Sequence, residues 1–275
     1  MASLEHYAFP TLGDRPIHTI NTADALAVLT PIWAEKHDTA QRVKQRMASV
    51  FDWAKGAGHY SSENPMNGLE KALPAVKRRV DHMPALAWRA LPEFFSELSD
   101  RDGISARCLA FIILTASRSK EARLAEWSEI NGDVWTIPAE RMKRGVDHRV
   151  PLSTGSLAEL EKVRGLDTDL VFPSANRGPD GRAKPMSDTV FSALTKRMGR
   201  TDFTTHGFRS TFRDWCGEAA QVEREVAEAA LSHAFGDRVE RAYARSDLFG
   251  RRRDLMQRWS DYTSGNGAKV LRLAQ

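Results

Sequence analysis

The stretch TTHGFRSTFRDW, residues 204–215, puts a proton-transfer group and a permanent cation within one helical turn. His206 and Arg209 stand three residues apart, so at the start of a helix both side chains would point in the same direction. The free backbone N–H groups at a helix start also favour anions. The pair therefore suits an anion that has to react, and the rest of the sequence must indicate which anion.

Two further cations stand where a charge needs an explanation. Arg118 follows the apolar run LAFIILTA, and a charge at the end of a buried helix needs a partner. Glu121 is close enough in sequence to be that partner, so a structural ion pair is the plainer interpretation. Lys143 falls where two strand-like runs, DVWTIPAE and HRVPLS, would turn, and an ordinary exposed turn lysine is the plainer interpretation there.

The segment ALSHAFGDRVERAYARSD adds a histidine and a tyrosine. His233 follows an apolar helical pattern, and Tyr243 comes ten residues later among several arginines. Taken singly, each of these two residues is more often a packing residue than a catalytic one.

Taken together, the six residues predict one kind of chemistry. The sequence offers no Cys/His metal cluster, no Gly-rich nucleotide loop and no adjacent acidic pair for Mg²⁺. Two guanidiniums can hold the non-bridging oxygens of a phosphodiester and stabilise a pentacoordinate transition state. A tyrosine can attack if it is helped to lose its proton, and a lysine can protonate the leaving oxygen. The combination fits metal-free phosphoryl transfer through a tyrosine ester.

Composition permits this interpretation without demanding it. The 275 residues carry 40 Lys and Arg against 36 Asp and Glu, a net charge of +4, which allows a nucleic-acid partner. Cys108 and Cys216 lie in apolar contexts and are expected to be buried, reduced thiols. No signal peptide or membrane-spanning run is visible, so we expect a soluble, cytoplasmic protein.

The chain is predicted to be mainly α with a small β-sheet and to divide near residue 80. Residues 1–15 are expected to be an irregular lead-in. Helical patterns follow in NTADALAVLTPIW and TAQRVKQRMASVFDWAKGAG, and a basic, proline-containing linker ends the first domain. In the second domain the runs DVWTIPAE and HRVPLS predict a hairpin. Its helices are expected in LPEFFSELSD, in GISARCLAFIILTAS and at 154–164, 187–199, 208–220, 222–232 and about 248–262.

The order and spacing of these motifs resemble the tyrosine recombinases of the phage integrase family, particularly integrases of prophages and genomic islands. The motifs are TASRSKEARLAEWSEI, MKRGVDHRVPLS, HGFRSTFRDW and LSHAFGDRVERAYAR. The resemblance is strong over roughly residues 80–262 and weaker over 15–75. The commoner Thr-Gly-x-Arg is replaced here by TASR. The family's active-site positions correspond to Arg118, Lys143, His206, Arg209, His233 and Tyr243.

The resemblance implies a mechanism. Tyr243 would attack the scissile phosphate and leave a 3′-phosphotyrosine and a free 5′-hydroxyl, while Arg118 and Arg209 clamp the phosphate. Lys143 would protonate the leaving oxygen, and His206 would exchange a proton with the tyrosine. The sixth residue, His233, would hydrogen-bond a non-bridging oxygen. Bond energy is conserved, so neither ATP nor a metal cofactor is required. Tyr262, the other late tyrosine, is interpreted as a packing or capping residue.

The resemblance also implies an architecture and partners. Residues 1–80 would form a helical, SAM-like core-binding domain and residues 81–275 an α+β catalytic domain, clamping double-stranded DNA from both sides. Salt-sensitive phosphate contacts are expected to dominate the affinity. The predicted DNA-binding residues are Arg42, Lys44, Arg46, Lys77 and Arg78. The working form would be a homotetramer on paired sites, with accessory DNA-bending or directionality factors as further partners.

Several alternatives stay open. The C-terminal AKVLRLAQ could dock on a neighbouring subunit or be a frayed terminus. Related integrases usually carry an arm-site-binding domain ahead of the core-binding helices, where this sequence starts. Regulated integration at a long attachment site is expected to need such a domain, whereas cleavage and ligation at a core site are not. A type IB topoisomerase shares the chemistry, and a decayed integrase that only binds DNA is the non-enzymatic alternative.

Overall fold

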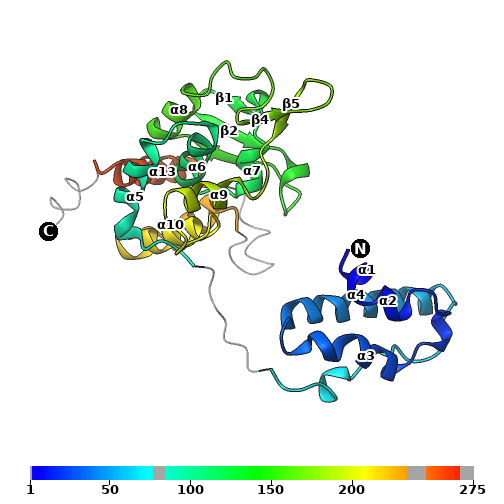
Figure 1. Ribbon diagram of the computed structural model, residues 1–275. Coiled ribbons are helices and arrows are strands. Elements are labelled where there is room, and N and C mark those ends of the chain that lie inside the picture. Colours follow the sequence, from blue (N-terminus) through cyan, green and yellow to red (C-terminus); the bar gives the residue numbers. More distant parts are fainter. Residues whose placement is uncertain (1, 77–83, 234–245, 267–275) are drawn as a thin grey trace. The chain divides into compact units, whose positions relative to one another are not determined.

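The computed structural model describes residues 2–76, 84–233 and 246–266, which fall into two compact units, Met1–Asp81 and His82–Gln275 (Figure 1). Each unit has a hydrophobic core of its own. Helices dominate both units and the sheets are small, as predicted. None of the helices within the described ranges is long and apolar enough to cross a membrane.

The N-terminal unit is built on the two long helices that the sequence predicted, α3 (Thr22–Trp33) and α4 (His37–Gly56). The irregular lead-in predicted for residues 1–15 is wrong, because Ala2–Tyr7 forms α1 and Phe9–Leu12 forms α2. Leu4 of α1, Leu12 of α2 and Ala8 between the two helices are buried in the core of the unit, four residues apart. Short 3₁₀ turns at Ile17–Thr19 and Leu69–Lys71 complete the unit.

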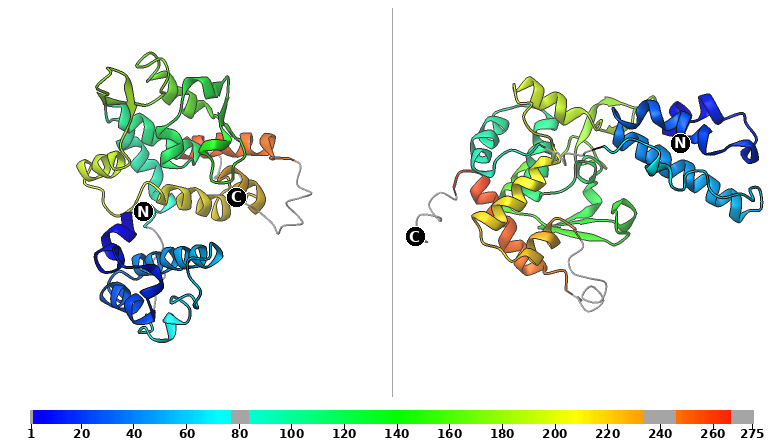
Figure 2. Two further views of the ribbon diagram at one scale, coloured as in Figure 1. Left: turned by 90° about the vertical axis from the view of Figure 1, so that its right-hand side faces the viewer. Right: turned by 90° about the horizontal axis from the view of Figure 1, so that it is seen from below.

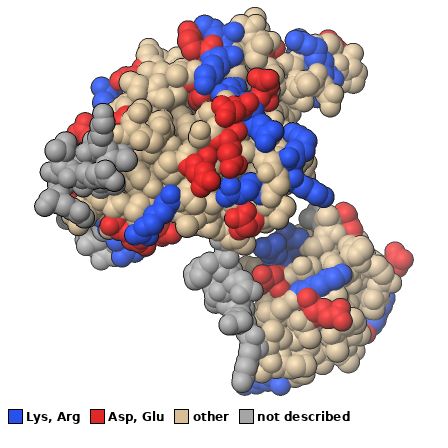
Figure 3. All heavy atoms as spheres, turned by 60° about the vertical axis from the view of Figure 1, so that its left-hand side comes forward, with Lys and Arg blue, Asp and Glu red and all other residues tan. Residues whose placement is uncertain are grey.

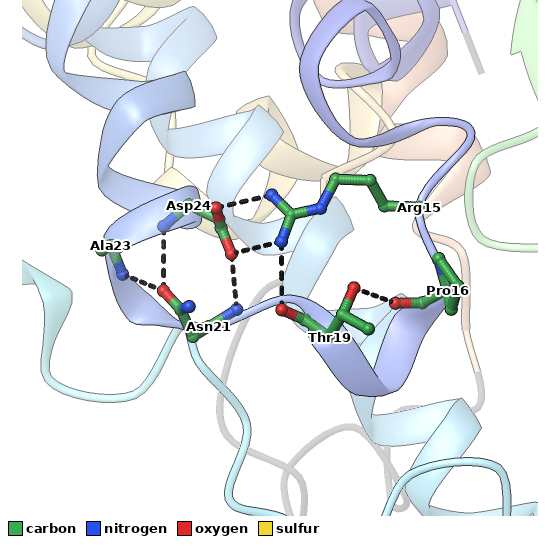
Figure 4. A network of polar contacts seen from close by, with 6 residues as sticks. All are labelled: Arg15, Pro16, Thr19, Asn21, Ala23 and Asp24. Atoms are coloured by element: carbon green, nitrogen blue, oxygen red, sulfur yellow. Dashed lines mark hydrogen bonds and ion pairs between the residues drawn. The ribbon is translucent and has the colours of Figure 1, made fainter.

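The start of α3 is fixed by a reciprocal cap (Figure 4). The Asn21 side chain accepts hydrogen bonds from the Ala23 and Asp24 backbone N–H groups at 2.8 and 3.2 Å, and the Asp24 carboxylate accepts the Asn21 N–H at 2.9 Å. Arg15 donates to the same carboxylate at 2.6 Å. This hydrogen bond, with the Asn21 N–H, holds the pKa of Asp24 below its ordinary value. The cap thereby ties the loop that enters α3 to its first turn.

The C-terminal unit is organised around α6 (Ile104–Thr115), which lies in the middle of the unit (Figure 1). Every residue from Ala106 to Thr115 is buried, because helices pack on several sides of α6. Even the charged Arg107 is buried, where it pairs with Glu159 at 3.2 Å. The surrounding helices are α5 (Leu91–Ser99), α7 (Ser119–Arg123), α8 (Thr154–Glu161), α9 (Val190–Arg197) and α13 (Phe249–Thr263).

Helix α10 (Gly207–Glu218) lies beside α13 through an aromatic cluster, and α11 (Arg224–Ala230) follows it (Figure 2). The rings of Trp215 and Trp259 are 4.9 Å apart. Tyr262 stacks on both rings and donates its hydroxyl to the Trp88 carbonyl at 2.8 Å, so it is a packing residue as predicted. Cys108 and Cys216 are buried free thiols, also as predicted, and burial raises the pKa of Cys216 to about 12.

The predicted hairpin is confirmed by β2 (Val134–Ile137) and β3 (His148–Pro151), which pair antiparallel with Ile137 opposite His148. A short strand β1 (Ile130–Asn131) extends this sheet in the order β1-β2-β3. A second hairpin, β4 (Pro173–Arg177) with β5 (Ala183–Pro185), was not predicted. The remaining 3₁₀ turns are Trp88–Ala90, Trp127–Glu129 and Ala139–Arg141.

Gly207, the first residue of α10, packs tightly against the backbone of residues 84–85. A Cβ added there would overlap the Pro84 carbonyl oxygen and lie 2.9 Å from the Ala85 Cα. We therefore expect Gly207→Ala to lower the free energy of unfolding by roughly 1–3 kcal/mol, since backbone atoms must shift. Gly217→Ala on the same helix is the control. Its Cβ would meet only Arg213 Nη1 at 3.7 Å, and alanine favours helix, so stability should hold or rise.

Denaturant unfolding of both variants provides the measurement. Equal stabilities for the two would contradict a tight contact between α10 and residues 84–85.

Candidate anion-binding active site

Arg209, in the first turn of α10, is the centre of the site. Its side chain is buried, and its guanidinium donates to the carbonyl oxygens of Ala116 and Leu231. Those two residues are the C-caps of α6 and α11, where the partial negative charge of a helix end favours a cation. Burial, and then repulsion from Arg118, lower the pKa of Arg209 to about 10, so it remains charged at neutral pH.

Arg118 caps α7 and carries the ion pair that the sequence suggested. Its guanidinium contacts Glu121 Oε1 at 2.6 Å, and its backbone N–H donates to Glu121 Oε2 at 2.7 Å. The arginine side chain is still 28% exposed, whereas that of Glu121 is 6% exposed. The charge of Arg118 repels protons on both Arg209 and His206 and so helps to lower the pKa of each. The ion pair therefore fixes Arg118 without removing it from the site.

The two predicted histidines reach the same cluster. His206 is the N-cap residue of α10 and remains accessible to solvent. Partial desolvation of its ring is the first cause that lowers its pKa, followed by the charges of Arg209, Arg118 and His233. A lowered pKa keeps its imidazole neutral and able to accept a proton at neutral pH. His233 lies just beyond α11, with Nε2 3.0 Å from an Arg209 nitrogen. Four of the six predicted catalytic residues thus come together.

The remaining two candidates are Lys143 and Tyr243. Lys143 is exposed in the turn between residue 142 and β3, and within the described ranges no hydrogen bond or ion pair joins it to the other candidates. Tyr243 lies outside the described residues. Within the same described ranges, no group of three or more His, Cys, Asp or Glu is arranged to hold a metal ion.

His148 is a residue of the site that sequence reasoning missed. It begins β3, and its pKa falls to about 4, first because of burial and then because Arg252, Arg118 and Arg209 repel a proton on the ring, against a smaller opposing effect of Glu121. The imidazole is therefore neutral among cations. A signal was available, since His148 stands within the motif MKRGVDHRVPLS, which was singled out only for its lysine.

Three of the five predicted DNA-binding residues, Arg42, Lys44 and Arg46, lie on α4. Arg42 and Lys44 of α4 line a groove of about 630 Å³ together with Asn67 and Glu70. Lys44 is already paired with Glu70. Arg42 is exposed on the groove. Of Arg42 and Lys44, Arg42 is therefore the cation that is available to contact a phosphate.

The remaining basic candidates are placed differently. Arg46 of α4 donates to the Ser3 hydroxyl of α1, and Lys77 and Arg78 lie outside the described residues. On the face of the C-terminal unit drawn in Figure 3, basic and acidic side chains are interspersed. Charge on that face alone therefore does not mark a binding surface, and the cluster around the buried Arg209 is the more specific feature.

Solved structures share this fold. A lambda integrase (residues 75–356) dimer bound to a COC′ core site superposes with a TM-score of 0.64 at 21% identity, covering 86% of each chain. A lambda integrase tetramer bound to a Holliday junction gives a TM-score of 0.64 at 18% identity, covering 86% of this chain and 71% of that one. The architecture of this chain is that of lambda integrase.

The sequence pattern of the Phage integrase family matches residues 89–248, and that of the phage integrase central domain matches residues 1–72. This chain belongs to the phage integrase family, as its motifs predicted. It is 32% identical to the integrase of Enterobacteria phage P4, covering 98% of this chain and 65% of that protein. It is 34% identical to the prophage integrase IntA of Escherichia coli K12, covering 94% of this chain and 63% of that protein. The chain thus spans just under two thirds of the length of these relatives.

His148 makes stability depend on pH. Between its ordinary pKa of 6.5 and the folded value of about 4, the unfolded chain binds a proton that the folded chain does not. Acidification through this window should therefore destabilise the wild type more than His148→Gln, by up to about 1.4 kcal/mol per pH unit. Denaturant unfolding at several pH values from 6.5 to 4 measures the difference. Parallel curves for the two proteins would show that His148 titrates normally.

Proposed function

We propose that this protein is a site-specific recombinase that cuts and rejoins double-stranded DNA through a covalent 3′-phosphotyrosine intermediate. The observation that carries the proposal is the convergence of Arg118, His206 and His233 on the buried, charged guanidinium of Arg209. Two guanidiniums with two imidazoles match a phosphodiester that gains negative charge in its transition state. Membership of the phage integrase family supports the same reaction.

In this reaction the Tyr243 hydroxyl oxygen attacks the scissile phosphorus, and the bond from phosphorus to the 5′ oxygen breaks. The tyrosine proton passes to the neutral imidazole of His206, and Lys143 gives a proton to the departing oxygen. Arg118 and Arg209 hold the non-bridging oxygens throughout. A free 5′-hydroxyl from another strand then attacks the ester and releases the tyrosine. One phosphoester replaces another at each step, so ATP hydrolysis is not needed, and the protein's own cations can take the part of a metal.

The proposed partners are double-stranded DNA and further copies of the chain. The lambda integrase structures contain a dimer on a core site and a tetramer on a Holliday junction, which supports a homotetramer on paired sites here. Residues 1–80 would act as the core-binding domain and residues 81–275 as the catalytic domain. The names of the relatives from phage P4 and Escherichia coli support integration or excision of a prophage or genomic island, in a bacterial cytoplasm.

Covalent capture tests the chemistry. We expect the protein, incubated in EDTA with a pool of nicked suicide duplexes, to form an adduct that survives a denaturing gel. Tyr243→Phe should abolish the adduct, because the attacking oxygen is gone, and Tyr262→Phe is the matched control that should keep it. If the adduct persists in Tyr243→Phe, Tyr243 is not the nucleophile. Absence of any adduct, with DNA binding retained, would favour a protein that only binds DNA. Joining of two duplexes, rather than resealing of one, would separate a recombinase from a topoisomerase.

Salt dependence tests the groove on α4. Each phosphate contact contributes about 0.9 to the slope of log affinity against log salt concentration. Arg42→Ala should therefore reduce that slope by about 0.9 in a binding titration. Lys55→Ala, which removes an exposed cation from the last turn of the same helix, should leave it unchanged. Equal slopes for Arg42→Ala and the wild type would exclude Arg42 from the DNA interface.

A further inference from the structure

The two ring nitrogens of His233 face different partners. Nε2 lies 3.0 Å from an Arg209 guanidinium nitrogen, and Nδ1 lies 2.7 Å from Glu228 Oε2. A guanidinium can only donate, so Nε2 accepts and Nδ1 carries the proton that Glu228 receives. The contacts therefore define one tautomer of the neutral ring.

Glu228 is itself held from the other side. Its second oxygen, Oε1, accepts from Arg213 Nε at 2.8 Å, and its side chain is only 15% exposed. Burial raises the pKa of Glu228, but the hydrogen bonds from Arg213 and His233 outweigh this effect and lower it overall. The carboxylate is thus charged, oriented and directed at the imidazole.

The backbone at the C-terminal end of α11 brings Glu228 and His233 together. Ser232 adopts a left-handed conformation with φ of 52°, and the His233 N–H donates to the Glu228 carbonyl at 2.9 Å. The chain therefore turns back at the end of α11, and a residue on that helix reaches the ring that follows it. This turn accounts for a contact between residues five apart, a spacing that a regular helix would not bring together.

We propose that Glu228, held by Arg213, is the positioning residue that orients His233 and stabilises its protonated form during DNA cleavage. The inference rests on the proposed recombinase function. Because Nδ1–H is committed to Glu228, Nε2 can donate to a non-bridging phosphate oxygen only after it takes a proton from solvent. The resulting imidazolium lies among the cations Arg209 and Arg213 and the neighbouring His206 of α10, and Glu228 supplies the negative charge that offsets them.

Cleavage by Glu228→Gln, measured as single-turnover adduct formation at saturating DNA, tests the proposal. A hydrogen bond to a charged group is lost, so we expect the rate to fall about 10- to 100-fold, with DNA affinity changed by less than about threefold. The imidazolium loses its counter-charge, so the alkaline limb of the rate profile should move to lower pH. Glu225→Gln is the matched control. It makes the same change on the same helix, where the carboxylate is half-exposed and paired with Arg251 at 3.5 Å.

A double-variant comparison separates positioning from general damage. If Glu228 acts through His233, adding Glu228→Gln to His233→Ala should slow cleavage by less than about twofold further. Additive losses in the double variant would overturn the proposal, as would a Glu228→Gln protein with the wild-type rate and pH profile.

The ring itself gives a readout that needs no variant. Nitrogen-15 NMR of the His233 ring in the free wild-type protein should show Nδ1 protonated and Nε2 bare, and the opposite tautomer would overturn the assignment even if Glu228→Gln does not fold. If the wild-type protein forms no adduct, the proposed recombinase function itself is wrong, independently of the role of Glu228.

Discussion

The C-terminal unit depends on a buried positive charge, that of Arg209, which pairs with no carboxylate among the residues that the structure describes. Leaving the Arg209 guanidinium unsatisfied inside the protein would cost several kcal/mol. The carbonyl oxygens that end α6 and α11 satisfy it, so the cation and the two helix ends stabilise one another. Because these carbonyls are neutral, they offset the burial without cancelling the charge. The arginine therefore keeps its attraction for an anion.

The other charged groups around Arg209 are fixed in a similar way. Glu121 holds Arg118 through two hydrogen bonds, and Glu228 holds His233 while Arg213 holds Glu228. Arg118 and His233, which we propose contact the phosphate, are thus each oriented by a carboxylate. Such preorganisation lowers the reorganisation needed when charge develops on a substrate. It also explains why an ion pair that looks merely structural in the sequence belongs to the site.

Sequence reasoning succeeded where the determining interactions are local or the pattern is long. Long apolar periodicities predicted α3, α4 and the helices of the C-terminal unit other than the short α7, and close spacing predicted the pair of Arg118 with Glu121. It failed for α1 and α2, whose apolar stripe is too short to stand out, and for the exposed β4–β5 hairpin, which lacks a buried face. His148 and Glu228 gain meaning only from neighbours that folding supplies. Ala116 stands where the family more commonly has glycine, and its φ of 50° is a conformation that glycine adopts more freely, so the structure accounts for the commoner glycine and not for its replacement.

The acceptors of Arg209 have a consequence for how the unit assembles. Ala116 is 93 residues away in the chain and Leu231 is 22 residues away. Loops of both lengths must close before the guanidinium has its partners, and the entropy of closing them is repaid only when α6, α10 and α11 have docked. A nascent or partly unfolded chain therefore has no partial version of this anion site. The cluster around Arg209 assembles in one cooperative step with the docking of these three helices.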